Sequence, residues 1–144
     1  ILLSDISVKY LKSIPYPDFL YDITRRPKGA FNCDYFSRKG PVVYGTPGFP
    51  SGHLTTITFF AIYMILNRFH KKNTDIIDFI RNDIAFVLTN LLLIVLTGWA
   101  RYQKKCHNLI QICGGIILGS LYAYIFHYII DIHLNLDNKP VSNE

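Results

Sequence analysis

Three long apolar blocks constrain the fold of this 144-residue chain more than any other feature. They cover residues 54–69, 84–100 and 109–132, and polar or basic segments separate them. A helix rises about 1.5 Å per residue, so such blocks can cross a hydrocarbon core about 30 Å thick, the first two with help from flanking residues. Because the 50% of residues that are hydrophobic concentrate in these blocks, we predict an all-α membrane helical bundle with at least three spanning helices.

The rest of the chain divides around these blocks into a single predicted domain, residues 1–144. Residues 1–14 are a short helix stub, and residues 15–50 are a long loop that holds most of the seven prolines. The stretch DFLYDIT inside this loop predicts a turn of helix, and residues 133–144 form a polar tail. Since the chain begins with Ile rather than Met, we expect it to be N-terminally incomplete.

The net charge of +5 raises the question of an anionic partner. No basic helix and no basic–aromatic sheet pattern is present, so we expect no nucleic-acid binding. The basic residues instead lie beside the apolar blocks, which suits membrane flanks or a phosphate site. They would also favour a cytosolic face for those flanks, but a phosphate site requires the same residues, so this rule decides nothing.

The three cysteines, Cys33, Cys106 and Cys113, contain no CxxC pair. They therefore predict neither a metal site nor a disulfide framework. Small buried thiols are the expected reading, with a bridge between Cys33 and Cys106 as the alternative.

Polar clusters gather on one side if all three blocks cross a membrane. The loop before the first block and the loop between the second and third then share a side, and the segment 70–83 and the C-terminus lie on the other. The clusters on the first side are RRPKGA (25–30), PSGH (50–53) and ARYQKKCHNLIQ (100–111). We therefore expect the chemistry of this chain at one face.

The PSGH cluster stands at the predicted start of the first long helix. Ser51 is a suitable N-cap, and the backbone N–H groups of a helix start attract phosphate. Gly52 lets a ligand approach the backbone, and His53 can give a proton to a leaving oxygen. Plain helix capping is the alternative for the motif as a whole, although capping does not explain the histidine.

The third cluster adds an oriented histidine. His107 and Gln111 are four residues apart, so they share a face if they open a helix. Gln111 can then accept a hydrogen bond from one ring nitrogen and leave the other as a nucleophile. Arg101 and Arg26 offer guanidinium groups for phosphate oxygens. Further positive charge near the ring keeps it neutral, and comes from Lys28, Lys104 and Lys105.

The ordered set RP, PSGH and R-x5-H, with a helper four residues later, resembles the PAP2 (type 2 phosphatidic acid phosphatase) superfamily. The resemblance implies that His107 attacks phosphorus and that His53 protonates the leaving group. It implies that the phosphate is held by Arg26, Arg101, Ser51 and Gly52, and that no metal or cofactor is needed. Its glutamine helper, Gln111, resembles the glucose-6-phosphatase-like and dolichyl-pyrophosphatase-like branches.

The chain departs from the family pattern at two further positions. Phe19 stands where the first motif has a lysine, and either Lys12 or Lys28 is expected to substitute for it in binding phosphate. Ala100 replaces the serine that usually opens the third motif. Both changes could weaken phosphate binding.

These observations predict a multi-pass membrane phosphatase that acts on a lipid phosphate or polyprenyl pyrophosphate through a phosphohistidine. The alternative is a catalytically degenerate PAP2-like membrane protein with a lipid-binding or structural role. Haloperoxidase chemistry in the same pocket is disfavoured, because those family members are mostly soluble.

Overall fold

The computed structural model describes residues 2–30, 33, 44–72 and 74–137. The described part is all-α, as predicted, with six α-helices and one 3-10 helix. The elements are α1 (Leu2–Ser13), η1 (Asp18–Leu20), α2 (Tyr21–Thr24), α3 (Gly52–Lys72), α4 (Ile76–Asn82), α5 (Ile84–Gln103) and α6 (Leu109–Asp137). The η1–α2 pair covers the DFLYDIT stretch and confirms its predicted turn of helix, whereas α4 was not predicted.

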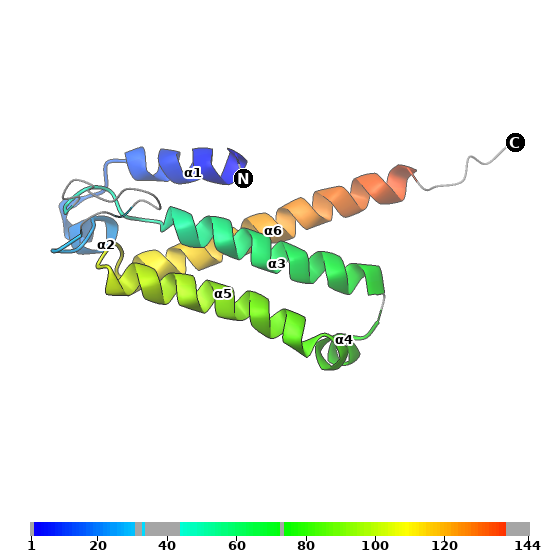
Figure 1. The fold of residues 1–144 in the computed structure, drawn as a ribbon. Coiled ribbons are helices and arrows are strands. Elements are labelled where there is room, and N and C mark those ends of the chain that lie inside the picture. Colours follow the sequence, from blue (N-terminus) through cyan, green and yellow to red (C-terminus); the bar gives the residue numbers. More distant parts are fainter. Residues whose placement is uncertain (1, 31–32, 34–43, 73, 138–144) are drawn as a thin grey trace, which may run out of the picture.

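Helix α3 is the centre of the bundle. It packs on α6 more extensively than any other pair of helices, then on α5, and α1 lies along its N-terminal half (Figure 1). The short elements η1 and α2 gather at one end of the bundle, and α4 lies at the opposite end (Figure 1). The start of α3, the end of α5 and the start of α6 therefore meet at the η1–α2 end.

Glycines let α6 approach α3 closely. A Cβ atom on Gly115 would lie 2.7 Å from the Ser51 carbonyl oxygen, and one on Gly119 would lie 2.5 Å from the Thr55 oxygen. Neither distance leaves room for a side chain, so both positions require glycine for α6 to approach α3 this closely. Gly114 instead faces the Phe49 ring, just before α3.

Two helices are long and apolar enough to cross a membrane, among the residues that were searched. They are Ile84–Gln103 and Leu109–Ile130, each with a mean hydropathy of 1.8. Only 17% and 28% of the two windows is buried, so most of their apolar side chains face outward, as lipid contact requires. The remaining expected span lies within α3, which is 21 residues long but more polar and is not one of these two.

A cluster of charged side chains joins two helices at the α4 end of the bundle. The Asp83 carboxylate is buried and accepts hydrogen bonds from Arg68 Nε at 3.0 Å and from Lys72 Nζ. The Lys72 hydrogen bond, reinforced by Arg68, lowers the pKa of Asp83. Both cations belong to α3 and Asp83 immediately precedes α5, so the cluster joins these two helices.

We predict that Asp83→Asn lowers the thermal midpoint at pH 7 by a few degrees, because two cations lose a charged partner. The η1–α2 end of the bundle should not change, because the cluster lies at the opposite end of α3. Thermal unfolding followed by circular dichroism in detergent would measure the effect. An unchanged midpoint would show that solvent already screens the cluster fully.

Candidate active site

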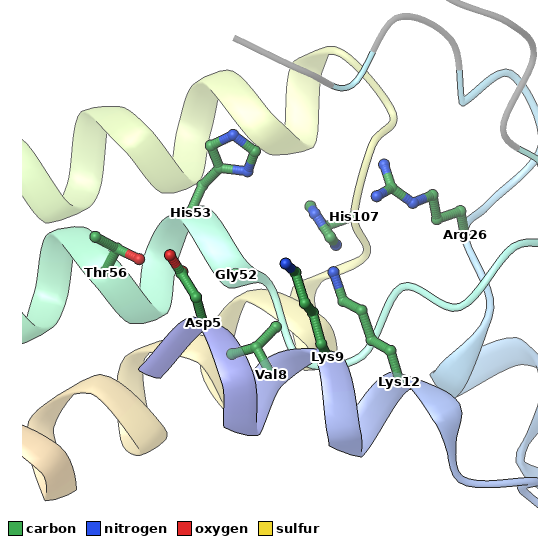
Figure 2. A pocket seen from close by; sticks show the side chains of 9 residues that line it. All are labelled: Asp5, Val8, Lys9, Lys12, Arg26, Gly52, His53, Thr56 and His107. Carbon is green, nitrogen blue, oxygen red and sulfur yellow. The ribbon is translucent and has the colours of Figure 1, made fainter. Parts of the chain in front are cut away.

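A cavity of about 360 Å³ opens between α1, the start of α3 and the loop that precedes α6. Both predicted histidines, His53 and His107, line it. Figure 2 shows Lys9 and Lys12 reaching from α1 toward His107, and the Arg26 guanidinium pointing at the same ring from the other side. The full lining is Asp5, Val8, Lys9, Lys12, Arg26, Gly52, His53, Thr56 and His107.

Helix α1 forms one wall of this cavity with a single face. The lining residues Asp5, Val8, Lys9 and Lys12 follow the i, i+3, i+4, i+7 spacing of one helical face. Val8 is buried, and a Cβ atom on Gly52 would lie 3.3 Å from its Cγ1 atom. The absence of a side chain at Gly52 therefore lets α1 pack directly over the start of α3.

The His107 ring is oriented by the predicted hydrogen bond to Gln111. His107 Nδ1 lies 3.1 Å from Gln111 Oε1. The Gln111 amide nitrogen donates to the carbonyl oxygens of Ile23 and Arg25, both at 2.8 Å. Because both amide hydrogens are used there, Oε1 must face the ring, and His107 must donate from Nδ1. His107 Nε2 is then left with a lone pair, as a nucleophile requires.

The same glutamine also caps α6, which the sequence analysis missed. Asn108 Oδ1 accepts a hydrogen bond from the Gln111 backbone N–H at 2.9 Å, and Gln111 Oε1 is 3.4 Å from the Asn108 backbone nitrogen. This reciprocal pair is a capping box. The signal was present as N-x-x-Q directly before an apolar run. Asn108 also donates to the Asp22 carbonyl oxygen at 2.8 Å, which ties the cap to α2.

Close backbone contacts hold the PSGH segment against α6. The Ser51 N–H donates to the Gln111 carbonyl oxygen at 3.0 Å. Just before it, a Cβ atom on Gly48 would lie 2.7 Å from Gln111 Oε1, so only glycine fits. The Gly48 N–H donates to the Thr24 oxygen at 2.7 Å. Two separate segments, residues 23–25 and 48–51, thus converge on Gln111.

The electrostatic surroundings keep His107 uncharged. Burial, then the positive charges of Arg26 and Arg101, lower the pKa of His107 from 6.5 to about 3, and Lys12 acts in the same direction. The hydrogen bond that His107 donates to Gln111 opposes this shift only in part. The imidazole is therefore neutral at physiological pH.

Ser51 does not cap α3 as predicted. Its side chain is fully buried, and its Oγ atom has no hydrogen-bond partner among the residues that the structure describes. The Ser51 carbonyl oxygen instead accepts from the Thr55 N–H at 2.9 Å and from Thr55 Oγ1 at 3.0 Å. The close approach of Gly115 to Ser51 places α6 directly against this residue.

The two predicted arginines occupy different places. Arg26 lines the His107 cavity, whereas Arg101 does not and instead lines a second cavity beside Ala100. Arg101 is buried, and its Nη2 atom donates to the Cys33 carbonyl oxygen. It acts on His107 through its charge, behind the cavity wall.

The structure distinguishes between the two candidate lysines. Lys12 lines the His107 cavity, whereas Lys28 lines a neighbouring cavity with Tyr44 and Asn108, and Arg26 lines both cavities. Phe19, at the position of the family lysine, is 81% exposed and lies outside both. Lys9 was missed by the sequence analysis, although its spacing from Lys12 on one face of a short helix could have indicated it.

The expectation of buried thiols is wrong for all three cysteines. Cys33 and Cys106 form a disulfide, with their Cα atoms 5.6 Å apart, so the alternative pairing is the observed one. Cys113 is a free cysteine but is exposed. The pairing depends on how the 15–50 loop folds back on the residue before His107, which no local pattern encodes.

Comparison with known proteins agrees with this geometry. The profile of the PAP2 superfamily matches residues 2–133. The chain belongs to the PAP2 superfamily. It is 24% identical over 81 residues to lipid phosphate phosphatase epsilon 2, chloroplastic, from Arabidopsis thaliana. That match covers 56% of this chain and 27% of the plant protein, so the chain spans only a part of that relative. No solved structure matches this chain significantly.

We predict that His107 stays neutral, with its hydrogen on Nδ1, from pH 8 down to pH 5. The pKa of about 3 lies far below this range, and Arg26→Met should raise it because one positive charge is lost. NMR of ¹⁵N-histidine-labelled protein in micelles would report both the tautomer and the titration.

The same shift makes a prediction for stability. A histidine in the unfolded chain has a pKa of about 6.5, so it binds a proton more readily than the folded His107 does. The free energy of unfolding that His107 contributes is therefore lost as the pH falls from 6.5 toward 3. A His107 signal that titrates near pH 6.5 in the folded protein would contradict both expectations.

Proposed function

We propose that this chain is an integral membrane phosphatase that hydrolyses the phosphate group of a lipid phosphate or polyprenyl pyrophosphate. The observation that carries this proposal is the neutral, oriented His107 in a cavity lined by cations. Arg26, Lys9 and Lys12 can neutralise a phosphate there, while His107 Nε2 keeps its lone pair for phosphorus.

In the first step, His107 Nε2 attacks phosphorus in line with the leaving oxygen. The N–P bond forms as the P–O bond breaks, and His53 gives its proton to the departing oxygen. In the second step, His53 takes a proton from water, and the water oxygen bonds to phosphorus as the P–Nε2 bond of the phosphohistidine breaks. Inorganic phosphate leaves, and both histidines return to their starting forms.

Each surrounding group has a distinct proposed role. Arg26 and Lys12 bind the phosphate oxygens from the cavity wall, and Gly52 lets the phosphate approach the start of α3. The unsatisfied Ser51 hydroxyl lies beside Gly52 as a further donor. Arg101 supports the negative charge from behind the wall, and Gln111 holds the His107 ring.

The position of the site suits a lipid substrate. The cavity lies near one end of the long helices, and the outward faces of α5 and α6 are apolar. A headgroup could enter there while its acyl or prenyl tail stays in the bilayer. We propose that α3 also crosses the membrane, shielded from lipid by α1, α5 and α6. The name of the plant relative supports a lipid phosphate as the substrate class.

We predict that His107→Ala lowers phosphate release by at least about 1,000-fold, because the nucleophile is lost. The measurement is phosphate release in mixed micelles from phosphatidate, a polyprenyl pyrophosphate and glucose 6-phosphate. A wild-type rate in this variant would overturn the mechanism. Phosphate binding without turnover by folded wild-type protein would instead support the degenerate, lipid-binding alternative.

A matched pair of lysine variants tests the shape of the site. Lys12→Met should lower kcat/KM by about 10- to 100-fold, because a charge-assisted contact to phosphate is lost. Lys28→Met removes the same charge from the neighbouring cavity and should change kcat/KM by less than about twofold. Equal losses in both variants would indicate that only the overall positive field matters.

A further inference from the structure

The Cys33–Cys106 disulfide joins the long N-terminal loop to the residue that directly precedes His107. Both cysteines are buried, and they form a small apolar cluster with Ala30. Ala30 follows Arg26 in the same segment, and its N–H donates to the Pro27 oxygen at 3.2 Å. The bridge therefore lies between two segments that supply side chains to the cavity.

Two hydrogen bonds close a ring around this bridge. Arg101 Nη2 donates to the Cys33 carbonyl oxygen, and the Cys106 N–H donates to the Arg101 carbonyl oxygen at 3.0 Å. The disulfide is thus linked to the end of α5 twice, through the side chain of Arg101 and through its backbone carbonyl. Breaking the S–S bond would release the Arg101 anchor and the backbone of His107 together.

We propose that this disulfide positions the catalytic histidine and that the site end of the bundle faces an oxidising compartment. The first half rests on the proposed function, since it concerns a catalytic role for His107. The second half does not, because it depends only on where the bridge lies. Cys33 and Cys106 act through Arg101 and His107 and touch no substrate, so they are positioning residues.

The compartment follows from thiol chemistry. Disulfides persist outside the cell or in oxidising lumens, whereas cytosolic thiols are kept reduced. The bridge is at the same end as His107, so that end is assigned to the oxidising side. The opposite end, around α4, then faces the cytosol and carries Arg68, Lys71, Lys72 and Arg81, in keeping with the positive-inside rule.

Basic residues at the site end argue against this orientation by the same rule. Arg26 and Lys12 line the cavity, however, and Arg101 is buried against Cys33. A phosphate site accounts for these three charges without reference to the cytosol, but not for the exposed Lys28, Lys104 and Lys105 at the same end. The charge of the loops at the site end therefore does not decide the membrane orientation. A disulfide does, because it persists on the oxidising side.

Thiol counting tests the bridge without any need for activity. Protein in native membranes is denatured and treated with a maleimide that adds a fixed mass to each free thiol. We expect one addition, at Cys113, before reduction and three after it. Three additions without reductant would overturn the proposal.

The sidedness is tested with two exposed lysines at opposite ends of the bundle, Lys28 and Lys71. In sealed membranes of known orientation, a membrane-impermeant maleimide should label Lys28→Cys from the oxidising side. Lys71→Cys should react from that side only after permeabilisation. The reverse pattern would overturn the assignment, whatever the activity of the protein.

The positioning role is tested by kinetics. Cys33→Ser, Cys106→Ser and the double variant should each lose about 10- to 100-fold in kcat/KM, the scale expected when a catalytic group shifts by about 1 Å. Cys113→Ser is the matched control and should keep wild-type kcat/KM. Size-exclusion chromatography selects folded protein, and reduction of the folded wild type gives the same comparison without a substitution.

Two kinetic outcomes would count against the positioning role. If the double variant melts earlier but keeps wild-type kcat/KM, the bridge only stabilises the fold, and the positioning role is wrong. If wild-type protein with an intact bridge releases no phosphate, the proposed function fails and the positioning role fails with it. Thiol counting and labelling would still decide the compartment.

Discussion

The Gln111 side chain is the point on which the site depends. Its oxygen accepts from His107 Nδ1, and its nitrogen donates to two carbonyl oxygens of the 15–50 loop. Its backbone begins α6 through the capping box with Asn108 and accepts the Ser51 N–H. One residue thus fixes the ring tautomer, the helix start and the loop. An aspartate or glutamate here would supply charge but could not donate to the two carbonyls, so the amide follows from this local architecture.

In the proposed reaction, the cavity must keep one histidine neutral and supply a proton from another. Burial and the charges of Arg26, Arg101 and Lys12 meet the first requirement, because they oppose protonation of His107. A bound phosphate reverses that balance, since its negative charge stabilises the imidazolium that forms when Nε2 attacks. In this proposal the cations have two roles: they keep the free nucleophile neutral, and they bind the phosphate of the substrate. Asp5, at the His53 side of the cavity in Figure 2, supplies a negative charge where the proton donor lies.

Sequence patterns were informative where the physics is local. Apolar runs predicted α5 and α6, and the spacing of four residues predicted the Gln111–His107 hydrogen bond, although His107 precedes Leu109, the first residue of α6, and does not itself open the helix. The patterns failed where distant segments meet. The disulfide, the position of Lys12 rather than Lys28 in the His107 cavity and the buried Ser51 hydroxyl all depend on how α1 and residues 15–30, 33 and 44–51 pack on α3 and α6. The short α4 was missed because its seven residues lie in a charged segment that reads as a loop.

The polarity of α3 follows from its central place. A helix in contact with lipid must present apolar side chains outward, and α5 and α6 do so. Helix α3 packs against α1, α5 and α6, so its buried positions include Thr55 and Thr58 beside the α6 glycines. Its first turn carries His53 and its last turn carries Lys71 and Lys72. The mean hydropathy of α3 is therefore lower than that of α5 and α6, because neighbouring helices surround the N-terminal part of α3, where the cavity lies.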